Sequence, residues 1–167
     1  QVGSGSNWIT DHAFNPWVWI THLEKIPDTT PILLGIPASY LGFIAFGLSA
    51  GWLLFLYHQS KKAPINTFLL SALMPLMSFL LLTKMHERYL APALPFLVLS
   101  AALSSSLLWP VYLGGSNVHL ANLYHNWWYP RIPFLVTFLS QDSTISLLIV
   151  TLLASTCLTL YTYVKKS

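Results

Sequence analysis

The spacing of the charged residues constrains the fold of this chain more than any other feature. Four long stretches contain no Asp, Glu, Lys or Arg, namely residues 29–60, 63–83, 89–130 and 143–164. About 20 apolar residues in a helix are enough to cross the hydrocarbon core of a bilayer. Only 8% of the 167 residues are charged, whereas a soluble domain has about 25%. The chain is therefore predicted to be an all-α, polytopic membrane helical bundle.

Five spanning helices fit these charge-free stretches. The stretch 89–130 is about twice as long as one crossing needs to be, so we divide it at Ser104-Ser105-Ser106, which we predict to be a tight turn. We expect residues 1–32 to form an external loop and residues 33–167 to form the transmembrane bundle. The predicted spans are about 33–57, 65–83, 88–103, 107–126 and 144–164.

A short aromatic helix is predicted within the N-terminal loop. Asn15 is a favourable N-cap residue and Pro16 a favourable first helical residue, and Trp17 and Trp19 follow them. The stretch ends near Glu24, so it is too short to span a bilayer, and tryptophan favours the headgroup region. We interpret it as an interfacial anchor.

The positions of the lysine pairs predict the orientation of the bundle. Four basic residues fall on each side of five helices, so the positive-inside rule does not decide the orientation by count alone. Lys61-Lys62 and Lys165-Lys166 directly flank predicted spans on one side, while all five acidic residues fall on the other side. We expect both lysine pairs to be cytoplasmic and Lys84 to Arg88 to be external.

Several classes of protein are disfavoured by what the sequence lacks. The eight basic residues are scattered and form no nucleic-acid-binding stripe. The single cysteine, Cys157, provides neither a disulfide framework nor a cysteine metal site. Leu90 occupies the position of the second histidine in an HExxH zinc motif, and no P-loop or GxSxG motif occurs. We expect no metal and no cofactor. The chain begins at Gln1 without a recognisable signal peptide, and we expect it to be part of a longer polypeptide.

A cluster of ionisable residues lies between the second and third predicted spans, in the segment KMHERY (residues 84–89). If this segment is helical, Lys84 and Arg88 share one face, and two cations suit a phosphate, with Arg88 as a bidentate donor and Lys84 as a point charge. His86 can donate a further hydrogen bond, while Glu87 and Tyr89 are candidates for positioning these groups. The alternative is a hydrated cluster whose cations extend to the membrane surface.

A polar stripe follows in the fourth predicted span. His119, Asn122 and Asn126 recur at i, i+3 and i+7 and so share a helix face. These side chains can contact substrate hydroxyls, or they can form hydrogen bonds between helices. In the N-terminal segment, Asp11 directly precedes His12, and we interpret that pair as part of a loop rather than as a catalytic pair.

Three segments together resemble a known family. KMHERYLAPALPFLVL resembles the signature of the bacterial relatives of the second mannosyltransferase of glycosylphosphatidylinositol-anchor synthesis, which are membrane enzymes of the GT-C fold. Before it, HAFNPWVW and LLGIPASYLGFIAFG resemble the aromatic segment of that family, and HLANLYHNWW resembles the segment after the signature. The His-Glu-Arg core is also similar to the His-Glu-Lys of the glucosyltransferases that extend dolichol-linked oligosaccharide. The resemblance covers about residues 7–130.

The resemblance implies that a sugar, with mannose as the expected one, is transferred from a polyprenyl-phosphate donor to an acceptor on the non-cytoplasmic side. It implies that His86 and Arg88 bind the donor phosphate as it leaves, and that Glu87 positions them. The expected partners are this lipid donor, the bilayer and the N-terminal remainder of the same enzyme, and the expected location is a bacterial plasma membrane.

The resemblance also implies a feature that this chain lacks. In the family, the aspartate that deprotonates the acceptor lies in the first external loop, which precedes the region present here. We therefore expect the chain to be the C-terminal, donor-side portion of the enzyme, without its catalytic base. The alternative from another functional class is a non-catalytic membrane subunit or transporter segment, in which the stripe of His119, Asn122 and Asn126 lines a path.

Overall fold

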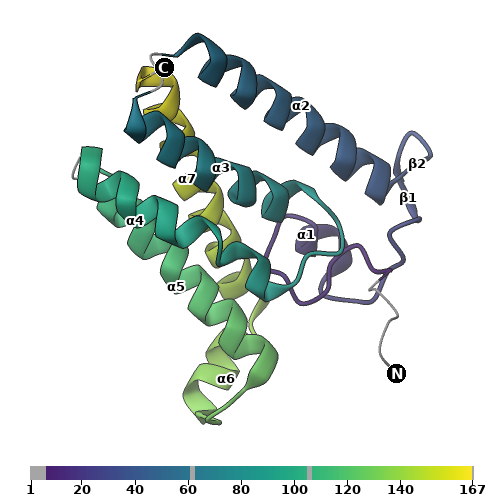
Figure 1. Cartoon of the computed structure of the whole chain (residues 1–167). Helices are drawn as coiled ribbons and strands as arrows, with labels where there is room; N and C mark the ends of the chain where they lie inside the picture. Colours follow the sequence, from purple (N-terminus) through teal and green to yellow (C-terminus); the bar gives the residue numbers. More distant parts are fainter. Residues whose placement is uncertain (1–6, 61–62, 105–106, 167) are drawn as a thin grey trace, which may run out of the picture.

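The computed structural model describes residues 7–60, 63–104 and 107–166. Its described residues are mostly helical, which confirms the predicted all-α class in its coarse form (Figure 1). The helices are α1 (Val18–Thr21), α2 (Ala38–Gln59), α3 (Pro64–Leu81), the 3-10 helix η1 (Glu87–Leu90), α4 (Ala93–Ser104), α5 (Leu108–Trp127), α6 (Pro133–Leu139) and α7 (Asp142–Lys166). Two short strands, β1 (Pro31–Leu33) and β2 (Ile36–Pro37), form an antiparallel hairpin.

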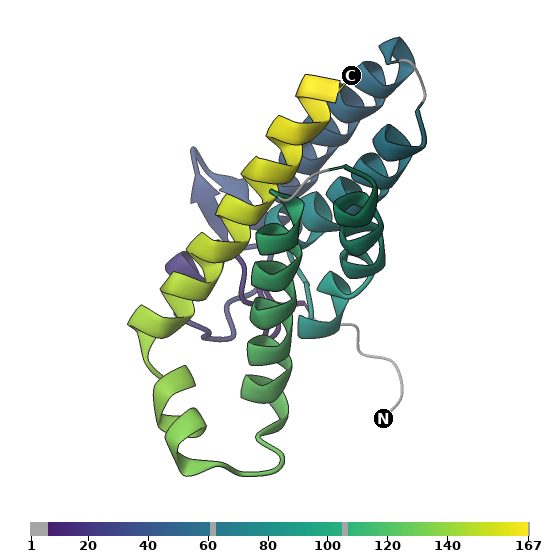
Figure 2. The ribbon, with the colours of Figure 1, turned by 90° about the vertical axis from the view of Figure 1, so that its left-hand side faces the viewer.

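Three of the described helices are long and apolar enough to cross a membrane: α2, α3 and α7. The helix α3 lies at the centre of the bundle, where it packs against α2, α4 and α7, while α5 packs against α4 and α7. Figure 2 shows α5 and α7 side by side, connected through α6. The main hydrophobic core lies between these helices and includes Leu73, Leu97 and Leu152.

The third predicted span, 88–103, is wrong in its first part. Residues 87–90 form the 3-10 helix η1, and the α-helix α4 begins only at Ala93. Pro92 has no N–H group, so inside a helix it would leave a carbonyl of the preceding turn unpaired, whereas just before a helix it has no such effect. The helix α4 has 12 residues and a length of about 18 Å, which is less than the hydrocarbon thickness of about 30 Å.

The first predicted span, 33–57, also begins too early. Residues 31–37 form the β1–β2 hairpin, and α2 starts at Ala38. Gly35, at the turn, has a φ of +76°, a conformation that glycine adopts without strain. The hairpin pairs Pro31 with Pro37. These turn residues prevent the helix from extending back to residue 33.

The predicted N-terminal helix is a single turn, and Asn15 does not cap it. The helix α1 begins at Val18, and its N-cap residue is Trp17. The buried side chain of Asn15 instead donates a hydrogen bond from Nδ2 to the carbonyl of Phe79, at 3.1 Å. Asn15 therefore fastens the N-terminal loop to the end of α3, and this long-range contact replaces the predicted local one.

The two ends of α3 lie beside different parts of the chain. The carbonyl of Lys166 accepts a hydrogen bond from Asn66 Nδ2 at 3.1 Å, so the end of α7 lies beside the start of α3 (Figure 1). The opposite end of α3 leads to residues 82–86 and η1, where the N-terminal loop also lies. Of the residues that predicted the orientation and the turn, Lys61, Lys62, Ser105 and Ser106 lie outside the described residues.

Gly42 is expected to be essential for the packing of α2 on α3. A Cβ atom at this position would lie 2.6 Å from the carbonyl oxygen of Leu81, and backbone cannot move aside as a flexible side chain can. Gly42→Ala is therefore expected to lower the free energy of unfolding by about 1 to 3 kcal/mol, measured by unfolding the full-length protein in detergent micelles with increasing SDS.

Gly47→Ala and Gly51→Ala are the matched controls, because a Cβ atom at either position has no neighbouring atom within 4 Å. Both changes are expected to leave the unfolding free energy unchanged or to raise it slightly, since alanine favours helix formation over glycine. An equal effect of all three substitutions would contradict the close approach of α2 to α3.

Candidate functional site

The segment 83–86 is not helical, because the N-terminal loop provides its backbone partners: residues 83 and 84 form a bend, and Met85 forms a β-bridge. Thr10 and Met85 form a parallel bridge, the amide of Lys84 donates to the carbonyl of Ile9 at 3.1 Å, and the amide of Asp11 donates to the carbonyl of Met85 at 3.2 Å. Lys84 itself has a φ of +62°. The prediction that Lys84 and Arg88 share one helix face is therefore wrong.

This pairing brings Asp11 beside His86. The distance between Asp11 Oδ2 and His86 Nε2 is 3.6 Å, and Asp11 Oδ1 lies 3.6 Å from His12 Nε2. Asp11 is only partly exposed. Sequence reasoning treated Asp11 as part of a loop, because no local pattern relates it to a histidine so distant in the chain. The structure makes its carboxylate the nearest acidic group to the imidazole of His86.

Arg88 provides an exposed cation next to this pair. The guanidinium carbon of Arg88 lies 6.0 Å from the centroid of the Tyr89 ring, and the ring of His86 meets Tyr89 edge-on at 5.3 Å. Tyr89 thus contacts both of these candidate phosphate-binding residues. Within the described part of the chain, Arg88 forms no ion pair, so its five N–H donors remain available for an anion.

Glu87 and His119 lie together in the interior of the bundle. Glu87 is buried, and its Oε2 atom has no hydrogen-bond partner among the described residues. His119, on α5, is also buried, and its Nδ1 atom has no hydrogen-bond partner among the described residues. Because α5 packs on η1, Glu87 lies close enough to act on His119 electrostatically. No ion pair between Glu87 and Arg88 occurs among the described residues, so the carboxylate of Glu87 does not contact the guanidinium of Arg88.

Asn122 connects the polar stripe to the N-terminal loop. Its Oδ1 accepts a hydrogen bond from the amide of Phe14 at 2.9 Å, and its Nδ2 donates to the carbonyl of His12 at 2.6 Å. The ring of Phe14 also contacts His125, with 5.0 Å between centroids. Asn126 is half-buried and has no side-chain hydrogen bond within the described ranges. Two members of the predicted stripe, His119 and Asn122, therefore contact the segments that carry the candidate site.

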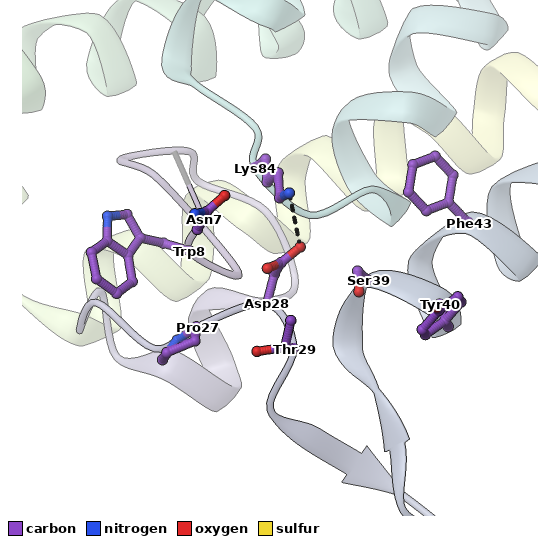
Figure 3. Close-up of a pocket in the computed structure, with 9 residues that line it drawn as sticks. All are labelled: Asn7, Trp8, Pro27, Asp28, Thr29, Ser39, Tyr40, Phe43 and Lys84. Atoms are coloured by element: carbon purple, nitrogen blue, oxygen red, sulfur yellow. Dashed lines mark ion pairs between the residues drawn. The ribbon is translucent and has the colours of Figure 1, made fainter. Parts of the chain in front are cut away.

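Lys84 forms an ion pair with Asp28, and it therefore has a different environment from His86 and Arg88. Its Nζ lies 3.2 Å from Oδ2 of Asp28, whose carboxylate is buried. Both residues line a cavity of about 690 Å³ (Figure 3), and neither His86 nor Arg88 lines it. The positive charge of Lys84 is therefore compensated by Asp28, and Arg88 is the exposed cation of the segment 84–89 that forms no ion pair within the described residues.

No group of three His, Cys, Asp or Glu side chains able to hold a metal ion occurs in the described ranges. Comparison with models of protein families, with curated proteins and with solved structures gave no match to the chain.

Proposed function

We propose that this chain is the donor-binding, C-terminal membrane portion of a glycosyltransferase. In this proposal a sugar, mannose being the expected one, passes from a polyprenyl-phosphate donor to an acceptor on the non-cytoplasmic side. The observation that carries the proposal is the convergence of three segments that lie far apart in the sequence. Residues 8–15, the segment 84–89 and the α5 residues His119 to His125 contact one another at one end of the bundle, and these are the segments in which the family resemblance lies.

The chemistry of transfer requires positive charge where the leaving group forms. When an acceptor hydroxyl oxygen attacks the anomeric carbon, the bond from that carbon to the phosphate oxygen breaks, and the electron pair leaves with the phosphate. Fixed hydrogen-bond donors at this position stabilise the transition state more than the ground state. Arg88 is suited to this role because its guanidinium is exposed and forms no ion pair within the described part of the chain.

The remaining groups of the site hold the two donors in place. Asp11 orients the imidazole of His86 from one side, and Tyr89 packs between His86 and Arg88. Glu87 positions the segment from within the bundle, where it lies close to His119. Asp11 is not assigned as the base that deprotonates the acceptor, because the resemblance implies that this aspartate lies in an upstream external loop.

The proposed membrane arrangement places the donor-binding residues on the non-cytoplasmic side. Five crossings are made by α2, α3, α4 together with η1, α5 and α7, in a bacterial plasma membrane. The end of α7, with Lys165 and Lys166, is cytoplasmic, and Arg88 faces outward. The alternative of a transporter segment has less support, because both polar atoms of the Asn122 amide are already hydrogen-bonded to the N-terminal loop.

The experiment that tests the proposal measures transfer from polyprenyl-phosphate mannose in membranes that contain the full-length protein, meaning the complete enzyme of which this chain is the proposed C-terminal portion. His86→Ala is expected to lower the rate by about tenfold or more, because one donor to the leaving phosphate is lost. The control is His58→Ala, since His58 is an exposed histidine near the end of α2. Equal rates for both variants, or no transfer by the unmodified protein, would contradict the proposal.

A further inference from the structure

The cavity lined by Asp28 and Lys84 has the features of a second binding site. Its volume of about 690 Å³ falls within the range of about 300 to 1,000 Å³ that is usual for small-molecule sites. Figure 3 shows the Asp28–Lys84 ion pair between Trp8 on one side and Tyr40 and Phe43 on the other. A few polar groups are thus combined with aromatic walls, which is the usual composition of a ligand pocket.

The charges in this cavity favour an uncharged ligand. The carboxylate of Asp28 is buried and lies 3.2 Å from the ammonium of Lys84, so the two charges compensate each other. The Lys84 side chain is still about half exposed, which leaves N–H groups free to donate to a ligand. Hydroxyl groups of Thr29 and Ser39 also line the cavity. This pattern of donors and acceptors without net charge matches a ligand that is rich in hydroxyl groups.

The apolar side of the cavity opens onto a membrane-spanning candidate. Tyr40 and Phe43 lie three residues apart on α2, so they share a helix face, and their side chains are 63% and 65% exposed. The apolar surface continues along α2 through Ile44 and Leu48, which are also exposed. A ligand with a hydrocarbon chain can therefore keep its polar part in the cavity while its chain follows α2.

We propose that this cavity binds the uncharged, hydroxyl-rich headgroup of an amphiphile, as in a glycolipid, with the hydrocarbon chain lying against α2. The site is distinct from the anion-binding candidates Arg88 and His86, which do not line it. The inference goes beyond the proposed transfer reaction and does not depend on it, because it is tested by binding alone.

The test is photo-crosslinking of the full-length protein in phosphatidylcholine nanodiscs. The probe is an octyl mannoside with a diazirine group on the first carbons of the octyl chain, and the labelled peptides are identified by mass spectrometry. Labelling is expected in peptides that contain Trp8, Thr29 or Tyr40, and unlabelled octyl mannoside is expected to reduce it at least tenfold. Labelling spread evenly along α2 would overturn the proposal.

Three competitors separate the possible ligand classes. Octanol, octyl phosphate and free mannose are each expected to need at least tenfold higher concentrations than octyl mannoside to reduce labelling equally. Equal competition by octanol would show that the cavity binds the hydrocarbon chain without recognising the headgroup. Equal competition by octyl phosphate would show that the cavity binds anions. Equal competition by free mannose would show that the hydrocarbon chain is irrelevant. Each of these three results contradicts the proposal.

A matched pair of variants links the labelling to the cavity. Phe43→Ala is expected to lower labelling at least fivefold, because it removes one aromatic wall. Phe55→Ala is expected to have no effect, since Phe55 is 58% exposed on the same helix and does not line the cavity. Both side chains are largely exposed, so neither change is expected to disturb folding. Equal labelling of the two variants would overturn the assignment.

Discussion

Replacement of Arg88 by alanine is expected to lower kcat for sugar transfer by about 100- to 1,000-fold, as for the loss of a preorganised donor to developing negative charge. The effect should fall mainly on kcat, because the phosphate gains negative charge only as the bond to the sugar breaks. The measurement is the initial rate of transfer at varied concentrations of polyprenyl-phosphate mannose, with the full-length protein at equal levels in membranes.

Two further variants make this result specific for Arg88. Arg88→Lys is expected to give an intermediate rate, because lysine keeps the charge but cannot provide the planar, bidentate donor. Arg131→Ala is the control, since Arg131 is also an exposed arginine and lies outside the segment 84–89. A rate for Arg88→Ala equal to that of Arg131→Ala would show that the segment 84–89 is a hydrated surface segment without a role in transfer.

Replacement of Asn122 by alanine is expected to give the largest loss of stability among single substitutions at the site. Its side chain binds the amide of Phe14 and the carbonyl of His12, and each buried backbone group left unpaired costs about 1 to 3 kcal/mol. We therefore expect a decrease of about 2 to 4 kcal/mol in the free energy of unfolding, measured by SDS titration in micelles. Hydrogen exchange at the amide of Phe14 should become faster at the same time.

Asn117→Ala is the control for this substitution. Asn117 lies on the same helix, but it is exposed and donates only to Leu113 of its own helix. Its replacement is expected to change the unfolding free energy by less than about 0.5 kcal/mol. Asn122→Asp is also expected to lower the stability strongly, because a buried carboxylate oxygen would then face the carbonyl of His12, and both are acceptors. Equal stability of the two alanine variants would contradict the role of Asn122.

The sequence predicts the helices of this chain better than their ends. Charge-free stretches indicate helices because a membrane segment must satisfy its backbone internally, and α2, α3 and α7 lie within such stretches apart from their terminal residues. The start of α4 after Pro92 and the hairpin around Gly35 also have local causes in the sequence. Both boundaries are marked in the sequence by proline or glycine, the residues that most often interrupt a helix.

The assembly of the site is harder to predict, because it depends on contacts between distant segments. Lys84 and His86 are close in the sequence, but Asp28 pairs with the first and Asp11 with the second. Periodicity reports only which residues share a face of one element. Periodicity does not indicate which loop supplies the backbone partner of Met85. The fold alone shows that Lys84 lies beside Asp28 while His86 lies beside Asp11.

The pairing of residues 8–11 with residues 83–86 determines when the site can form during biosynthesis. The helices α2 and α3 lie between the two partners in the chain, so the contact requires that both helices are inserted and that they return the chain to the side from which α2 started. Asn122 adds the requirement that α5 is in position. Contacts between distant segments form late, because the intervening chain must first be ordered. In the proposed membrane arrangement, the candidate site is thus completed only by molecules whose helices have inserted with that topology, and a helix inserted the wrong way would leave the parts of the site on opposite sides of the membrane.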